Sequence, residues 1–179
     1  MRPEEIIRPV VDKFQEKVAV FVRQHQESFT AKGFGKFVAC LRTLIAEVGR
    51  DLFRRMVEAQ EECGETVTKD GRVYRRKERY PKEWLTPFGT VTIGRNYYQR
   101  DAGGDGHVPI DARCGMEDEY MTPEVKEMVA MGAAMAVPSE VAALLGKALP
   151  DGPSVTAVQA VIKEVGEFAE THGDEIETA

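Results

Sequence analysis

Hydrophobic residues recur at three- and four-residue steps near both ends of the chain, and a period of two replaces this pattern in the middle. Residues 9–26 and 35–61 show the helical period, with Pro9 suited to the first helical position and Lys32-Gly33 breaking the pattern between them. We expect the two helices to form an antiparallel hairpin, or part of their apolar surface to contact a second chain. The apolar positions are Val10, Val11, Phe14, Val18 and Phe21 in the first helix, and Phe37, Val38, Leu41, Leu44, Ile45, Val48, Leu52 and Met56 in the second.

The middle of the chain has the composition of β-strands. Residues 72–80 and 90–98 are rich in Val, Ile, Thr and Tyr, and turn residues stand at Lys69-Asp70-Gly71 and Pro87-Phe88-Gly89. This pattern predicts a hairpin of two or three strands, with Val91, Ile93 and Tyr97 on one face. Residues 101–121 are rich in Gly and Asp and are expected to form a connecting loop.

The C-terminal third predicts three helices, at residues 122–136, 139–149 and 154–168. Thr122, Ser139 and Ser154 are placed to cap them, and Pro123 suits the first helical position. The last two helices are separated only by Pro150-Asp151-Gly152-Pro153, a spacing typical of a helix-turn-helix. In the last helix Val155, Val158, Ile162 and Val165 are expected to face inward, whereas Thr156, Gln159 and Lys163 point outward and can meet base edges or phosphates.

These elements predict a mainly α fold with a small antiparallel β-hairpin or sheet. We divide the chain into an N-terminal helical hairpin (residues 1–62), a basic β-hairpin with an acidic loop (63–121) and a helix-turn-helix-like helical region with an acidic tail (122–179).

Charge is distributed unevenly along the chain. The net charge is −6, but residues 69–100 contain nine basic and three acidic residues, a local charge of +6 that leaves −12 for the remainder. A basic segment within an acidic protein indicates a polyanionic partner, and interleaved aromatic residues favour nucleic acid. Residues 122–170 carry three basic and seven acidic residues, which disfavours phosphate binding there. The candidate DNA contacts of the basic segment are Arg72, Arg75, Arg76, Lys77, Arg79, Arg95 and Arg100, and its aromatic residues are Tyr74, Tyr80, Trp84, Tyr97 and Tyr98.

The sequence gives little support for disulfide bonds, membrane spans or metal sites. The three cysteines, Cys40, Cys63 and Cys114, form no C-x-x-C pair, which favours a reducing cytoplasm. No secretory signal is visible, and the longest weakly polar run, residues 128–138, is far shorter than the roughly 20 residues of a membrane span. The acidic loop contains Asp101, Asp105, His107 and Asp111 without the spacing of a known metal site, so we expect no metal ligand there.

Two motifs resemble a family of mobile-element proteins. The stretch Leu85-Thr86-Pro87-Phe88-Gly89-Thr90-Val91-Thr92-Ile93, with Arg95 and Tyr97-Tyr98, is followed by Val108-Pro109-Ile110-Asp111 and by the helix pair at residues 139–166. This order resembles the N-terminal part of insertion-sequence transposases of the ISKra4 type and, more loosely, the related ISLre2-like group. The resemblance implies a helical N-terminus, a hairpin, a helix-turn-helix-like region and then an RNase H-like nuclease with an acidic catalytic triad.

The chain departs from that family in two ways. Relatives often have cysteine pairs flanking the hairpin that look like a zinc ribbon, but residues 99–103 contain no cysteine, so we predict no zinc and no other cofactor. The chain also ends where the nuclease would begin, so we expect no catalytic residues. The hypothesis is a non-catalytic portion of a transposase that binds double-stranded DNA and forms a homo-oligomer through its N-terminal helices. The alternative is a dimerisation or interaction module that associates with an intact transposase or another partner without binding DNA.

Overall fold

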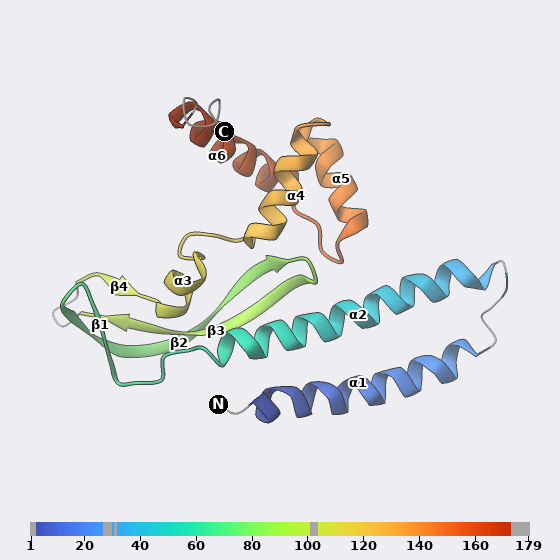
Figure 1. Cartoon of the computed structure of the whole chain (residues 1–179), viewed down its shortest axis with the longest axis horizontal. Coiled ribbons are helices and arrows are strands. Elements are labelled where there is room, and N and C mark those ends of the chain that lie inside the picture. The colour runs from blue at the N-terminus through green and yellow to red at the C-terminus, as the bar shows by residue number, and fades with distance from the viewer. Residues whose placement is uncertain (1–2, 27–29, 31, 101–103, 173–179) are drawn as a thin grey trace. The chain divides into compact units, whose positions relative to one another are not determined.

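The protein is mainly α-helical with one small antiparallel sheet, as the sequence predicts (Figure 1). The computed structural model describes residues 3–26, 30, 32–100 and 104–172. The chain forms two compact units: unit 1 comprises residues 1–84 and 90–120, and unit 2 comprises residues 85–89 and 121–179. The helical hairpin and most of the β segment therefore belong to one unit. None of the helices in the described residues is long and apolar enough to cross a membrane.

Two long helices of unit 1, α1 (Pro3–His25) and α2 (Gly33–Glu58), run antiparallel to each other. Lys13 pairs with Asp51, and Lys17, which comes later on α1, pairs with Glu47, which comes earlier on α2. This order is that of antiparallel helices. The expected start of α1 at Pro9 is wrong, because the helix begins at Pro3 and Pro9 lies inside it. A proline N–H is dispensable only in the first turn, so Pro9 leaves one helical hydrogen bond unmade.

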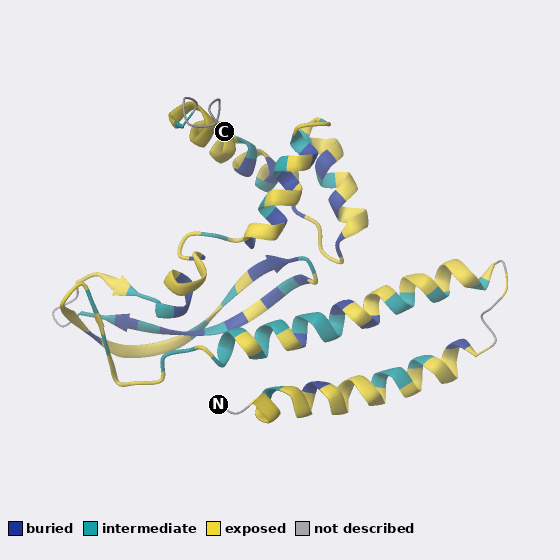
Figure 2. Cartoon of the chain, viewed as in Figure 1, coloured by how far each residue is buried: buried dark blue, intermediate teal, exposed yellow. Residues whose placement is uncertain are grey.

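The predicted apolar positions of this hairpin divide into two sets. Val10 and Leu44 are buried between the helices, whereas Val11, Val38, Ile45, Leu52 and Met56 are exposed, as the exposed bands along both helices show (Figure 2). Since α2 also contacts the sheet through Phe53 and Val57, its apolar residues lie on more than one side of the helix.

The sheet has the strand order β1-β2-β3-β4, with β1 (Thr66–Lys69), β2 (Arg72–Thr86), β3 (Gly89–Gln99) and β4 (Gly106–His107). Asp70 and Gly71 join β1 to β2 with φ values of 53° and 73°. Positive φ at both central residues is the requirement of a type I′ hairpin turn, which explains the Asp-Gly sequence. Strand β2 continues six residues beyond its predicted end because Trp84, Leu85 and Thr86 are buried rather than exposed.

Two glutamates cover the free edge of β3. The backbone N–H of Gly94 donates to Glu58 Oε1 at 2.9 Å, and that of Asn96 donates to Glu61 Oε2 at 3.0 Å. Burial raises the pKa of Glu61, and the hydrogen bond from Asn96 offsets part of this effect. Glu58, the last residue of α2, and Glu61, three residues after it, thereby supply acceptors that a neighbouring strand would otherwise provide.

The core of unit 1 lies where the sheet contacts α2. Trp84, Val91, Ile93 and Met116 form a buried cluster, and the ring of Phe53 meets that of Trp84 edge-on at 6.4 Å. Met116 follows the short helix α3 (Pro109–Cys114), which forms within the segment that we expected to be a loop.

Unit 2 is a bundle of α4 (Pro123–Ala133), α5 (Pro138–Ala148) and α6 (Val155–Thr171), in which each helix contacts the other two. Ser154 caps α6 as predicted, because its hydroxyl accepts from the N–H of Ala157 at 3.2 Å. Ser139 is not the N-cap of α5, because the helix begins one residue earlier, at Pro138. Thr122 is at the N-cap position of α4, but its side chain makes no capping hydrogen bond. The core consists of Leu85, Met121, Val125, Val129, Val141, Leu145, Leu149, Val158 and Val161.

Gly152 allows the close turn between α5 and α6. A Cβ at this position would lie 2.4 Å from the Cα of Gly146, which is backbone and cannot move aside. Among the described residues, φ is positive at Asp70, Gly71, Gly89 and Gly115 but not at Gly152. Close approach therefore explains this glycine.

We predict that Gly152→Ala destabilises unit 2 by more than 1 kcal/mol, because the methyl group meets the α5 backbone. Gly166→Ala is the matched control: Gly166 lies within α6 with open space around it, and alanine there should stabilise the helix by about 0.5–1 kcal/mol. Urea unfolding of both variants measures the difference. Equal effects of the two substitutions would contradict the close-approach explanation.

Asp51 makes the helical hairpin sensitive to acid. Burial alone would raise the pKa of Asp51, but the hydrogen bond from Arg54 and the charges of Arg55 and Lys13 outweigh burial and lower it. The carboxylate therefore stabilises the fold above its unfolded pKa of about 3.9, and this contribution is lost as pH falls through the lower folded value. We predict that Asp51→Asn destabilises the protein at pH 7 and that native and variant converge near pH 2, as measured by urea unfolding at both pH values. A difference independent of pH would contradict this account.

Candidate nucleic-acid interface

The basic residues of β2 line a face of the hairpin that remains open. Arg75, Lys77 and Arg79 alternate along the strand and are all exposed, as predicted. Thr66 of β1 is paired with Arg75 and therefore shares its face. Arg72 and Arg76 are also exposed. Five of the seven predicted hairpin contacts are therefore accessible to solvent.

Two of these cations, Arg76 and Arg79, contact neighbouring groups. Arg79 lies 3.5 Å from Glu58 and 3.4 Å from the carbonyl oxygen of Gly94, and Arg76 donates to the carbonyl oxygen of Cys63 at 3.2 Å. Arg72 and Lys77 form no ion pair with another residue that the structure describes. Arg79 is exposed and Glu58 is half-buried, and an ion pair at the protein surface contributes only about 0–1 kcal/mol, so a phosphate can compete for the guanidinium.

Arg95 is buried, unlike the accessible residue that the sequence led us to expect as a candidate DNA contact. Its side chain is 4% exposed, pairs with the carboxylate of Asp111 and lies over the ring of Tyr80, 4.6 Å from the centroid. The alternation of β3 places Arg95 on the covered side of the sheet, where a bound phosphate cannot reach it. Arg100 is half-buried at the end of the sheet.

Asp111 has a role that the sequence did not predict. It lies in α3, is 2% exposed, and Lys82 Nζ approaches it to 3.6 Å in addition to Arg95. Burial raises the pKa of Asp111, and the charges of Arg95 and Lys82 offset this rise in part. The available signal was an acidic residue directly after the apolar stretch Val108-Pro109-Ile110, because a buried acid needs a cationic partner.

A pocket of about 480 Å³ adjoins this ion pair. Lys69 Nζ lies 3.5 Å from Nδ1 of His107 beside it, and the pKa of His107 is lowered by burial and by the charge of Lys69. No cluster of three His, Cys, Asp or Glu side chains able to hold a metal ion occurs among the described residues. Asp101 of the acidic loop lies outside them. The pocket is lined by Tyr80, Lys82, Arg95, Tyr97, Gly106, His107, Val108, Asp111, Glu117 and Asp118.

The aromatic residues do not interleave with the exposed cations. Tyr74, Trp84 and Tyr98 are buried, and Tyr80 and Tyr97 are half-buried with their ring centroids 5.9 Å apart. The hydroxyl of Tyr98 lies 2.8 Å from the carbonyl oxygen of Glu62. Since stacking on a base requires an accessible ring face, the open face can attract phosphates but offers no platform for bases.

A separate candidate surface lies on α6 in unit 2. Thr156, Gln159 and Lys163 are exposed and recur at helical steps, as predicted, so they share one side of the helix. Lys163 is 3.6 Å from Glu167, and Glu164 pairs with Lys126 at 2.8 Å. Of the four positions predicted to face inward, Val158 is buried and Ile162 packs against the core, as expected, whereas Val155 and Val165 are exposed. Val161, which was not among them, is buried as well.

The residues that carry the family resemblance have structural roles in this hairpin. Thr86 Oγ1 donates to the carbonyl oxygen of Gly89 at 2.7 Å and accepts from the N–H of Phe88 at 3.1 Å, which fixes the turn between β2 and β3. Val91 and Ile93 belong to the core. Arg95 and Asp111, which come from the two different motifs, form one ion pair.

We predict that Asp111→Asn destabilises the protein by about 3–5 kcal/mol, because it leaves Arg95 charged and buried without its partner. The double substitution Arg95→Met with Asp111→Leu should recover most of this loss, since it removes both charges and retains apolar packing. Lys82 keeps the carbonyl oxygens of Met116 and Glu117 as acceptors in both variants. Urea unfolding measures each step, and a double variant as unstable as the single one would contradict the ion-pair explanation.

Comparison with protein-family models and with curated proteins gives no match for this chain. The resemblance to transposases therefore depends on the residues of the two motifs alone. The function must be argued from the charges and surfaces described above.

Proposed function

We propose that this chain binds double-stranded DNA as the non-catalytic N-terminal portion of a transposase of the ISKra4 type. The observation that carries the proposal is the exposed basic face of β2, where Arg75, Lys77 and Arg79 alternate along the strand. Alternate residues of a strand lie about 6–7 Å apart, so these three cations span about 13 Å and can contact several phosphates.

The expected mode of binding is mainly electrostatic. Phosphate contacts supply affinity and orientation without reading sequence. The buried aromatic residues exclude base stacking by Tyr74, Trp84 and Tyr98. Sequence preference, which recognition of element ends requires, then falls to Thr156 and Gln159 of α6, whose side-chain types can hydrogen-bond to bases. The glutamates beside Lys163 oppose phosphate binding at this helix, so its contribution to affinity is small.

A second candidate function is an interaction module that associates with an intact transposase or another partner without binding DNA. It is favoured by the exposed apolar side chains along α1 and α2, among them Phe34, Ile45 and Met56. The first candidate function predicts that the chain binds DNA, and the second predicts that it does not.

We predict that the chain binds a fluorescent DNA duplex with an affinity that falls steeply with salt, by a slope of about −0.9 in log–log form per phosphate contacted. Replacing Arg75, Lys77 and Arg79 together by Ala should weaken binding at every DNA sequence and reduce the slope by about 2–3. Fluorescence anisotropy from low to high salt measures both quantities.

The matched control replaces three exposed cations of α1 and α2 by Ala, namely Arg8, Arg23 and Lys36. This variant changes the net charge by the same amount and should retain most of the affinity and slope. If both triple variants lose binding equally, total charge rather than the β2 face is responsible. Binding by the native chain that does not depend on salt would overturn the proposal and leave the interaction module.

A further inference from the structure

We propose that α1 and α2 bind a second copy of this chain through one continuous apolar face, so that two helical hairpins form a four-helix bundle. This inference deepens the second candidate function by naming its partner, and it does not depend on DNA binding. We define the apolar face as Ile7, Val11, Phe14, Val18 and Val22 of α1 with Phe34, Val38, Leu41, Ile45, Val48, Leu52 and Met56 of α2.

The spacing of these residues is that of a helix–helix seam. On α2 the steps are four, three, four, three, four and four residues, and on α1 they are four, three, four and four. Alternation of three and four is the seam of packed helices, in which every apolar side chain faces the partner. All twelve positions are apolar, so no charge has to be desolvated within the seam.

Helical geometry places both seams on the same side of the hairpin. On α1 the line of contact with α2 runs through Val10, Lys17 and Phe21, and on α2 it runs through Phe37, Leu44 and Asp51. Successive residues of a helix are rotated by about 100° around its axis. On both α1 and α2, the apolar seam is therefore rotated by roughly a quarter turn from the line of contact with the other helix. The rotation has the same direction on both helices when each is viewed along its own chain. Because the two helices are antiparallel and face each other along their contact lines, these equal rotations place both seams on the same side of the hairpin.

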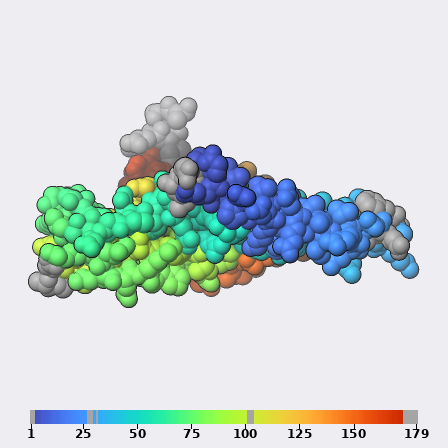
Figure 3. Space-filling view, turned by 90° about the horizontal axis from the view of Figure 1, so that it is seen from below, coloured from blue at the N-terminus to red at the C-terminus, as the bar shows by residue number. Residues whose placement is uncertain are grey.

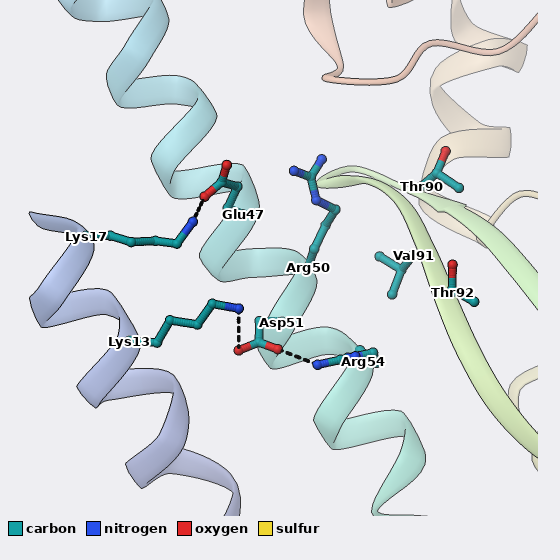
Figure 4. Close-up of a pocket in the computed structure, with 9 residues that line it drawn as sticks. All are labelled: Lys13, Lys17, Glu47, Arg50, Asp51, Arg54, Thr90, Val91 and Thr92. Atoms are coloured by element: carbon teal, nitrogen blue, oxygen red, sulfur yellow. Dashed lines mark hydrogen bonds and ion pairs between the residues drawn. The ribbon is translucent and has the colours of Figure 1, made fainter. Parts of the chain in front are cut away.

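The opposite side of the hairpin has charged residues that join the two helices. It carries the ion pairs of Lys17 with Glu47 and of Lys13 with Asp51, which line a pocket together with Arg50 and Arg54 (Figure 4). The third side of α2 contacts the sheet through Phe53 and Val57. The apolar face is therefore the surface of the hairpin for which a partner is missing.

The exposed area suits a stable dimer. Nine of the twelve side chains are 36–56% exposed, which amounts to roughly 800 Å² per chain, the area that each partner contributes to a typical stable interface. Within unit 1 the two helices form an arm that extends beyond the sheet, so a second arm can reach them (Figure 3). A second copy suits this face. Each hairpin has two apolar seams side by side, so the seams of one copy can pack against the same seams of the other in a symmetric dimer.

We predict that the native chain has a mass of about twice 19.9 kDa at micromolar concentration, measured by sedimentation equilibrium. Ile45→Glu with Met56→Glu should yield a monomer, because each dimer interface would then bury four unpaired carboxylates. Both residues are more than half exposed, so the variant should keep the native helix content, which circular dichroism checks.

The control pair is Val20→Glu with Leu144→Glu, two exposed apolar residues outside the face that add the same charge. This variant should remain a dimer. A monomeric native chain, or a dimer that persists in the Ile45/Met56 variant, would overturn the proposal. Loss of the dimer and loss of DNA binding are separable, because mass reports the first and the salt slope of the β2 face reports the second.

Discussion

The buried ion pair between Arg95 and Asp111 determines how the sheet is used. A guanidinium and a carboxylate removed from water hold each other in place, because either one alone would be strongly unfavourable there. Arg95 belongs to β3 and Asp111 to α3, so the pair fixes this short helix against one side of the sheet. The ring of Tyr80 and the ammonium group of Lys82 complete the enclosure. Residues on that side of the sheet pack against α3, whereas Arg75, Lys77 and Arg79 of β2 lie on the opposite side.

This division changes what the positive charge can do. The sequence places cations and aromatic rings side by side, a combination that favours both phosphate contact and base stacking. In the folded protein Tyr74, Trp84 and Tyr98 are internal, whereas Arg75 and Lys77 are external. Attraction to a polyanion is therefore separated from recognition of bases. A surface of this kind suits a module that holds a duplex while another surface selects the sequence.

The sequence predicted the helices, strands and turns better than it predicted which of their faces are buried. The Asp70-Gly71 turn and the Ser154 cap follow from local geometry, and both are present. Arg95 was misplaced because a period of two separates the faces of a strand without indicating which face another element covers. The apolar positions of α2 were read as one stripe for a similar reason. A helix that contacts α1, the sheet and a free side has apolar residues in several directions, and periodicity alone cannot assign them. Asp111 was assigned to a loop, since no long-range partner can be read from a single chain.

The two glutamates at the end of α2 have a consequence for how this protein can associate. Glu58 and Glu61 already occupy the N–H groups of Gly94 and Asn96, so an extended peptide cannot add to this stretch of β3 without displacing both carboxylates. Edge-to-edge strand pairing, the usual route from an open edge to fibrous aggregates, is blocked at this point by side chains rather than by a further strand. Replacing Glu58 and Glu61 by residues without a hydrogen-bond acceptor would leave the N–H groups of Gly94 and Asn96 unpaired and open this stretch of β3 to a strand of a second molecule.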